Sequence, residues 1–179
     1  MSGLSDELVL ERVARGDRDA MRILYDRHAP SLHRFVTRWI ANENDAADVV
    51  HDAMLDVWRT ADRFAGRSSV KSWVFSIGRF KAIDRNRKGA RTVLDDSEIE
   101  IIDDTPNPEE VTQAFQDSAH VRSCVEALSG PQKTAIQLAF YEDLTYQEIA
   151  DLENCPVGTI KTRIMHAKKL LLRCLASKA

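Results

Sequence analysis

Several residue types and patterns that mark particular protein classes are scarce in this 179-residue chain. It has 3 Cys, 7 Gly and 5 Pro, and it lacks the Asn-Gly and Asp-Gly pairs that favour β-hairpin turns. No apolar run approaches the length needed to cross a bilayer, and charge appears within the first six residues. We therefore do not expect a fibre, a secreted chain or a membrane protein. We expect a globular protein of the cytoplasm.

The cysteines are odd in number, widely spaced and without a C-x-x-C pair: Cys124, Cys155 and Cys174. Such spacing is unlike a disulfide framework or a zinc site. We expect buried, reduced thiols, and no metal or other cofactor.

Signatures of catalysis are missing as well. The five His are scattered, no Gly-rich phosphate loop is present, and no Ser/His/Asp or metal-ligand spacing stands out. We therefore expect a binding protein with no catalytic residues and no small-molecule substrate.

What the sequence does contain is a series of helix signals, which predicts an all-α fold. Breaks at Gly16, Pro30, 42–44 and 64–69 separate the first helices. The expected helices there cover about residues 5–15, 17–28, 30–41, 45–62 and 70–87. Later starts are expected at Asn107-Pro108 and at two capping boxes, Ser129 to Gln132 and Thr145 to Glu148.

The net charge of −3 hides a strong asymmetry. Residues 1–93 carry 17 Lys and Arg against 13 Asp and Glu, and residues 118–179 carry 8 against 6. Residues 94–117 carry 9 acids and no base. An acidic, Pro-containing stretch of this kind is typical of a flexible linker. We expect two small domains, 1–93 and 118–179, joined by the linker 94–117, which either is a plain tether or transiently covers the basic faces beside it.

The C-terminal segment predicts a helix-turn-helix motif. A short helix at 145–152 is followed by a tight turn at 153–155, and Pro156 opens a longer helix. From Asn154 to the end no Asp or Glu occurs. Lys, Thr and Met on the exposed side of that helix suit the donors, acceptors and thymine methyls of a DNA major groove, which favours DNA binding over a merely solvated helix.

Two features of the N-terminal segment also suggest partners. On helix 45–62, Asp48, Asp52 and Asp56 are spaced by four residues, so they line one side as a docking face for a basic protein or as a solubilising face. The segment 73–91 then mixes aromatic and basic residues, as single-strand-binding surfaces do, although Trp73 and Phe75 each fit a core equally well. The stretch FAGRSSVK at 64–71 is the better place to hold an extruded base.

Together these segments resemble the extracytoplasmic-function (ECF) sigma factors of bacterial RNA polymerase, over nearly the whole chain. The resemblance is carried by CPVGTIKTRI at 155–164, by DAADVVHDAMLDVWRTADRF at 45–64 and by SSVKSWVFSIGRFKAIDRNRK at 68–88. It implies a sigma region 2 domain at 1–93 and a sigma region 4 domain at 118–179. It also implies core RNA polymerase (β′ clamp helices and β flap), promoter DNA and an anti-sigma factor, which holds the protein inactive until a stress signal, as partners.

The resemblance implies three groups of site residues. Contacts to the −35 element are expected from Thr159, Lys161, Thr162, Arg163, Met165, His166, Lys168 and Lys169. Contacts to the −10 element and to melted DNA are expected from Phe64, Arg67, Ser68, Ser69, Lys71, Trp73, Arg79, Phe80, Arg85, Arg87 and Lys88. Docking on core polymerase is expected from Asp48, His51, Asp52 and Asp56.

Two other functions remain open. A sigma-like decoy would keep the fold to sequester an anti-sigma protein and would not bind promoter DNA. A self-sufficient helix-turn-helix repressor would use the C-terminal motif alone, but it would leave the row of Asp side chains and the basic-aromatic segment without a role.

Overall fold

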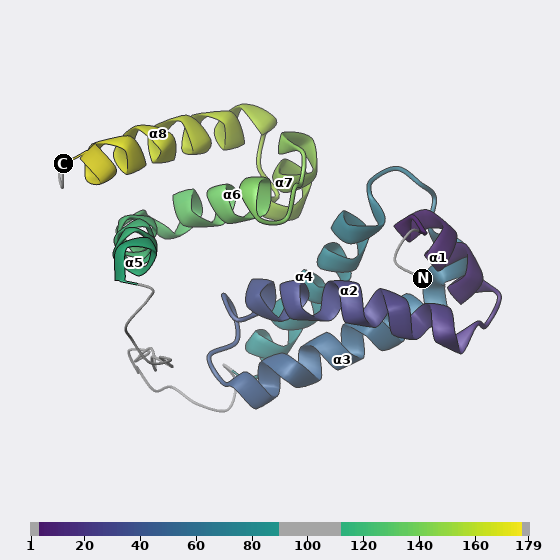
Figure 1. Cartoon of the computed structure of the whole chain (residues 1–179). Coiled ribbons are helices and arrows are strands. Elements are labelled where there is room, and N and C mark those ends of the chain that lie inside the picture. The colour runs from purple at the N-terminus through teal and green to yellow at the C-terminus, as the bar shows by residue number, and fades with distance from the viewer. Residues whose placement is uncertain (1–3, 90–111, 177–179) are drawn as a thin grey trace. The chain divides into compact units, whose positions relative to one another are not determined.

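The computed structural model describes residues 4–89 and 112–176, and within these ranges the regular structure is entirely helical. The chain divides into two units, Met1–Ile99 and Glu100–Ala179. The first unit contains α1 (Asp6–Ala14), α2 (Arg18–Val36), α3 (Glu43–Thr60), the short 3-10 helix η1 (Ala61–Arg63) and α4 (Val70–Gly89). The second contains α5 (Thr112–Glu126), α6 (Gly130–Phe140), α7 (Tyr146–Glu153) and α8 (Val157–Ala176). Figure 1 shows both as bundles of packed helices, so the predicted all-α fold with two small domains is confirmed.

Short polar side chains begin the first three helices of the first unit. Ser5 accepts a hydrogen bond from the amide of Leu8, and Asp17 accepts two, from the amides of Asp19 and Ala20. Such caps satisfy amides that have no partner within the helix. The amide of Ala20, and next the side chain of Arg12, lower the pKa of Asp17 below its ordinary value. Asn42 begins α3 in the same way.

The prediction of a break at Pro30 is wrong, because α2 runs through Pro30 without interruption. A proline in a helix interior removes one hydrogen bond and typically costs about 3 kcal/mol. Here the buried face continues on both sides of it, through Leu24, Leu32 and Val36. Burial of such side chains contributes about 1.5–3 kcal/mol each, so packing outweighs the local cost.

The core of the first unit lies where α2, α3 and α4 pack against one another, as Figure 1 shows. Leu32, Met54 and Phe75 are almost completely buried there. Gly78 lets α4 approach α2 closely, because a Cβ at this position would lie 2.5 Å from Leu32 Cδ1. The same core buries six residues of α3, namely Ala46, Val49, Val50, Ala53, Met54 and Val57, while Trp58 is half-buried.

In the second unit both predicted capping boxes are present, at Ser129 with Gln132 and at Thr145 with Glu148. They set the starts of α6 and α7, whose buried residues pack against α8. The start expected at Asn107-Pro108 lies outside the described residues, and so do residues 94–111 of the expected acidic linker, whereas residues 112–117 belong to α5.

The expectation of three reduced thiols is wrong for two of them. Cys124 on α5 and Cys174 on α8 form a disulfide, with a Cα–Cα distance of 5.8 Å. Cys155 is free and half-buried. Fifty residues separate the paired cysteines, so only the packing of α5 on α8 brings them together.

Candidate nucleic-acid interface

The turn between α7 and α8 is tight because Asn154 takes a left-handed backbone conformation, with φ 51° and ψ 50°. Asn tolerates this conformation better than most residues other than Gly. The next amide, that of Cys155, donates to the carbonyl of Ala150 at 3.0 Å and so closes the end of α7. The chain then enters α8 at Val157, which gives the predicted helix-turn-helix arrangement.

One side of α8 is fixed in the core and the other is open. Ile160, Ile164 and Ala167 are buried against the preceding helices, at the spacing of three and four residues that places them on one side of a helix. The opposite side exposes Lys161, Thr162, Met165, His166, Lys168 and Lys169. This surface offers cations, a hydroxyl and a thioether side by side, which is the combination that can contact phosphates, base edges and thymine methyls.

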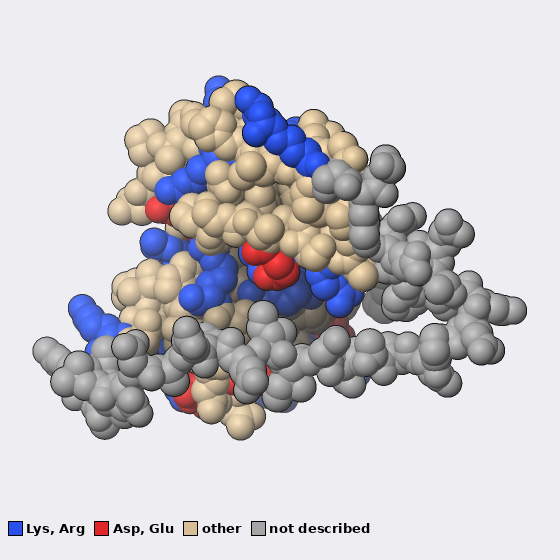
Figure 2. All heavy atoms as spheres, turned by 90° about the vertical axis from the view of Figure 1, so that its left-hand side faces the viewer, with Lys and Arg blue, Asp and Glu red and all other residues tan. Residues whose placement is uncertain are grey.

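The charges on this face differ in how they are restrained. Among the described residues no ion pair reaches Lys161 or Lys169. The ammonium of Lys168 lies 4.9 Å from the centre of the Phe140 ring. Figure 2 shows Lys and Arg side chains standing out from a largely uncharged surface in the upper part of the face that it views. Because Lys161 and Lys169 have no ion pair within the described residues, they are available to a polyanion without first breaking one.

Two other predicted contacts on α8 have partly covered side chains. Arg163 is half-buried, and its guanidinium lies 3.9 Å from a carboxylate oxygen of Glu153 and 4.0 Å from the sulfur of Cys155. Thr159 is also half-buried. The hydroxyl of Thr162 donates to the carbonyl of Gly158 at 3.0 Å, which leaves its oxygen free to accept. Through its contacts with Glu153 and Cys155, Arg163 stabilises the turn in this conformation.

On α3 the row of acids is partly neutralised by α4. The guanidinium of Arg85 donates to Asp45 and, at 3.2 Å, to Asp48. The hydrogen bond to Asp45 is the main cause that raises the pKa of Arg85 above its ordinary value. Lys81 lies 2.6 Å from Asp56. These ion pairs join α3 to α4, and they occupy Asp48, Asp56 and Arg85, which were predicted as contacts to partners.

The remaining predicted docking residues are open. His51 and Asp52 are exposed, and no ion pair within the described part of the chain involves either one. Beside them is an apolar hollow between α2 and α3, to which Tyr25, Leu55 and Trp58 contribute. Tyr25 and Leu55 are each 38% exposed, so this surface combines an unpaired carboxylate with accessible apolar side chains.

The loop before α4 combines an aromatic anchor with exposed positive charge. Phe64 packs on Trp73, with ring centres 5.3 Å apart, and both side chains are half-buried. Arg67 is exposed, whereas Ser68 and Lys71 are half-buried. Ser69 accepts a hydrogen bond from the amide of Ser72 at 3.2 Å, so it caps α4.

Along α4 the other predicted contacts are scattered over different environments. Phe80 is 71% exposed, which is a high value for a large aromatic side chain. Arg79 is half-buried, and Arg87 lies 3.2 Å from Asp84. The side chain of Lys88 lies outside the described residues.

An aromatic and cationic cluster at the end of α2 was not predicted. The Trp39 ring lies 5.1 Å from Phe35, and the guanidinium of Arg38 lies 4.5 Å from the centre of the Trp39 ring. Arg79 approaches the same ring from α4, at 5.9 Å. The neighbouring Arg38-Trp39 pair was the one sequence signal for this cluster, since the contribution of Arg79 depends on how α4 packs.

A helix-turn-helix module and a bundle with paired α3 and α4 helices are the two parts of a sigma-70-type factor. Comparison with protein families supports this class: residues 24–92 match sigma-70 region 2, and residues 119–171 match sigma-70 region 4.

Similar proteins narrow the class. The ECF RNA polymerase sigma-E factor of Haemophilus influenzae is 28% identical to this chain, covering 94% of both proteins. That of Escherichia coli K12 is 29% identical, covering 94% of this chain and 93% of the relative. A solved structure of the sigma factor RpoE with the anti-sigma factor NepR, from Bartonella quintana, is 27% identical with a TM-score of 0.60, and covers 87% of this chain and 96% of that one. The chain belongs to the ECF sigma factors, the initiation factors of bacterial RNA polymerase.

Within the described residues no helix has the length and hydropathy of a membrane span.

Proposed function

We propose that this sigma factor divides promoter recognition between its two units, with α8 reading the −35 element. The observation that carries the proposal is the exposed face of α8, where Lys161 and Lys169 are free of ion pairs. A recognition helix contacts base edges mainly with its N-terminal residues, and Lys161 lies in the second turn of α8. Lys161, Thr162, Met165 and His166 contact bases in this proposal, while Thr159, Lys168 and Lys169 contact the flanking backbone.

The first unit is proposed to hold the −10 element. Exposed Arg67 and the half-buried Phe64 and Trp73 form a loop that can grip a single strand through phosphate contact and base stacking. Phe80 on α4 offers a second stacking surface. Arg79, Arg87 and Lys88 supply further positive charge, whereas Arg85 would have to release Asp45 and Asp48 before it could contact DNA.

Docking on core polymerase is proposed to involve α3. His51 and Asp52 are exposed beside the apolar hollow between α2 and α3, so they can form the first contact with a basic partner. Asp48 and Asp56 are paired with Arg85 and Lys81, respectively. They would strengthen docking only if these ion pairs open or the cations exchange partners. Asp52 is therefore the carboxylate on which docking depends most.

We further propose that the working units are residues 1–93 and 118–179, with 94–117 as the tether. In this proposal the protein performs no catalysis itself. It acts in the cytoplasm together with its polymerase. One relative of this chain, the sigma factor RpoE of Bartonella quintana, has been solved in complex with the anti-sigma factor NepR. By analogy, an anti-sigma protein holds this sigma factor inactive until a stress signal. Co-expression with the product of the neighbouring chromosomal gene tests this, since absence of both a stable complex and a loss of transcription would contradict it.

Transcription in vitro with purified core polymerase on genomic fragments tests the main proposal. We expect new start sites with the wild-type chain, fewer with Lys161→Ala because promoter recognition is weakened, and fewer with Asp52→Ala because docking is weakened. Glu7→Ala, an exposed acid on α1, is the matched control for Asp52→Ala and should leave both properties unchanged. A sigma-like decoy would bind the anti-sigma protein and give no start site with any of these variants.

A further inference from the structure

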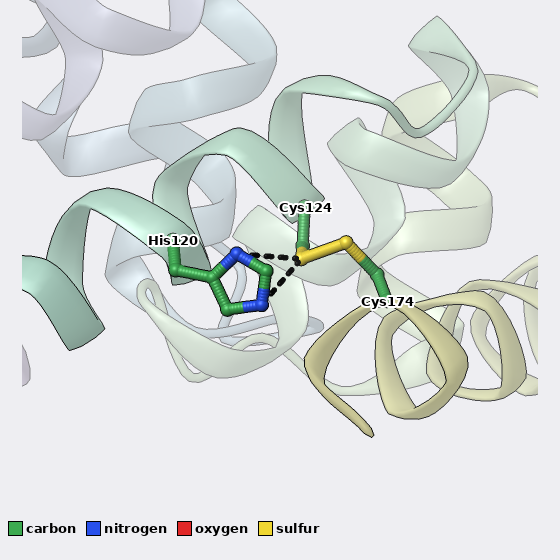
Figure 3. A group of neighbouring side chains, drawn as sticks. All are labelled: His120, Cys124 and Cys174. Carbon is green, nitrogen blue, oxygen red and sulfur yellow. Dashed lines mark hydrogen bonds between the residues drawn. A yellow bond between two sulfur atoms is a disulfide. The ribbon is translucent and has the colours of Figure 1, made fainter. Parts of the chain in front are cut away.

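The second unit contains a cluster of metal-ligating side chains that promoter recognition does not use. His120 and Cys124 lie on α5, and Cys174 lies on α8. One ligand atom from each residue can be chosen so that all three lie within 4.8 Å of one another. Figure 3 shows the imidazole of His120 facing the sulfur of Cys124, with Cys174 on the other side of that sulfur.

The spacing on α5 is suitable for binding one metal ion with two ligands. His120 and Cys124 are four residues apart, so they lie on the same face of the helix, one turn from each other. The Nε2 atom of His120 lies 3.9 Å from the sulfur of Cys124. A nitrogen and a sulfur bound to one tetrahedral zinc ion are about 3.6 Å apart, given bond lengths of about 2.0–2.1 and 2.3 Å. The distance between the two ligand atoms is therefore close to the required one. Because Nδ1 lies 4.0 Å from the same sulfur, the imidazole must rotate so that one nitrogen lone pair points at the shared ion.

The third ligand needs only a small displacement. When the disulfide is reduced, the two sulfur atoms must separate to about 3.8 Å to bind one zinc ion through bonds of about 2.3 Å. Cys174 is half-buried near the end of α8, where a change of side-chain rotamer can provide this separation. Cys124 is 2% exposed, so a metal here would be shielded on the α5 side.

We propose that reduced Cys124 and Cys174, together with His120, form a zinc-binding site, and that the disulfide is the oxidised alternative of the same site. Two thiolates and an imidazole are ligands that suit Zn²⁺. Among the described residues the cluster has these three members, so water takes the fourth position. The proposal uses one element of the proposed function, namely that a protein acting with RNA polymerase is in a reducing compartment, where thiols are normally kept reduced.

Oxidation by a peroxide converts one state to the other. One thiolate attacks the O–O bond and becomes a sulfenic acid, and a hydroxide leaves. The second thiolate attacks that sulfur, the S–S bond forms and a second hydroxide leaves. Two electrons pass from the sulfur pair to the peroxide, two protons from solvent convert the hydroxides to water, and Zn²⁺ is released because its sulfur ligands are no longer thiolates.

The test measures zinc in the purified full-length chain after reduction and removal of loose metal by a weak chelator. The wild-type chain and the control Cys155→Ser are expected to hold about one zinc ion per chain, as a structural or catalytic site does. His120→Gln should weaken binding by at least about 10-fold, since even outer-shell changes have effects of that size. This variant retains both cysteines, so circular dichroism should show an unchanged fold and the disulfide should still form on oxidation.

Replacement of zinc by Co²⁺ gives a second readout, because cobalt bound to thiolates produces a thiolate-to-cobalt absorption band. This band should be present in the wild type and in Cys155→Ser. It should be lost in the double variant that combines Cys124→Ser with Cys174→Ser. Peroxide should release the zinc as two of the 3 thiols disappear. A reduced wild type that binds no more zinc than the double variant overturns the proposal, and so does zinc binding that His120→Gln leaves unchanged. Neither outcome depends on transcription, so this proposal and the proposed function can fail separately.

Discussion

The basic residues of α4 and those of α8 are similar in number along the chain but different in how they are engaged. On α4, Lys81 and Arg85 form ion pairs with acids of α3, and Arg87 pairs within its own helix. On α8, Lys161 and Lys169 have no ion pair within the described residues. The second unit therefore presents free positive charge, whereas much of that on α4 stabilises the packing of its own unit.

This difference shows why counting charges along a sequence is not enough. A paired cation can bind a phosphate only by giving up its carboxylate, and the exchange contributes less than the binding of a free cation does. The acidic row on α3 is affected in the same way, because the same pairs reduce the charge that a partner meets. The two units also differ in what supports them, since the second has a disulfide and the first relies on packing and ion pairs.

The largest expected effect concerns the support of the second unit. In the oxidised chain, Cys174→Ser should lower the free energy of unfolding of this unit by about 2–4 kcal/mol, because the disulfide closes a loop of 50 residues. All 3 Trp, at positions 39, 58 and 73, lie in the first unit. Circular dichroism should therefore show an earlier transition, while the Trp fluorescence transition should not move. Equal shifts in both signals would show that the two units unfold together.

The next effect concerns the free charge on α8. Lys161→Ala should reduce discrimination between the correct promoter and a mutated −35 element by about 1–3 kcal/mol, the usual contribution of a good base contact. Binding of polymerase with the variant sigma factor to both promoters measures it. Lys169→Ala is the matched control and should weaken binding to every sequence equally, with a smaller dependence on salt. If Lys161→Ala gives that uniform loss instead, Lys161 contacts only phosphate.

A smaller effect concerns the paired charge on α4. A double-mutant cycle of Arg85→Ala and Asp45→Ala should give a coupling of about 0.2–1 kcal/mol in the free energy of unfolding of the first unit, as partly exposed ion pairs do. Unfolding followed by Trp fluorescence measures it. Arg87→Ala, whose side chain is 79% exposed, should have almost no effect. A coupling of zero would mean that Arg85 is as available to DNA as Lys161.

The last prediction concerns pH, and it affects only the first unit. Burial lowers the pKa of His28 below its ordinary value of 6.5, although Asp6, whose carboxylate lies 2.8 Å from Nε2, opposes this shift. Lys71 and Arg27 lower the pKa further. Below 6.5 the unfolded chain therefore takes up a proton that the folded chain resists, and stability should fall as the pH falls.

Urea unfolding at about pH 7.5 and pH 5.5, read by Trp fluorescence, measures this loss of stability. His28→Gln should reduce the loss, because the buried group no longer ionises. His33→Gln on the same helix is the control and should not reduce it. A stability that rises on acidification would show instead that the attraction of Asp6 for protonated His28 outweighs burial.

Local signals predicted a large part of the fold. The capping boxes at Ser129 and Thr145, the break at 42–44 and the apolar spacing on α8 depend on residues within a turn or two of one another, so sequence specifies them. The break predicted at Pro30 was wrong because the outcome there depends on distant residues. Its local cost was evident in the sequence, while the compensating burial of Leu32 and Val36 depends on helices distant along the chain.

The candidate sites divide along the same line. The exposed face of α8 was predictable because one helix with a single buried stripe defines which residues remain outside. The pairing of Arg85 with Asp45, the placement of Arg79 over Trp39 and the cluster of His120 with Cys124 and Cys174 all join segments far apart in sequence. The spacing of four residues between His120 and Cys124 was visible in the sequence, but no spacing rule could have indicated Cys174 or the partners of Arg85 and Arg79.

The sequence by itself therefore determined that the chain is helical, where most helices begin, and which side of α8 is exposed, because these follow from periodicity and from hydrogen bonds within a few residues. Only the tertiary structure decided which cations are free and which cysteines meet, because both depend on distances between helices that packing alone sets.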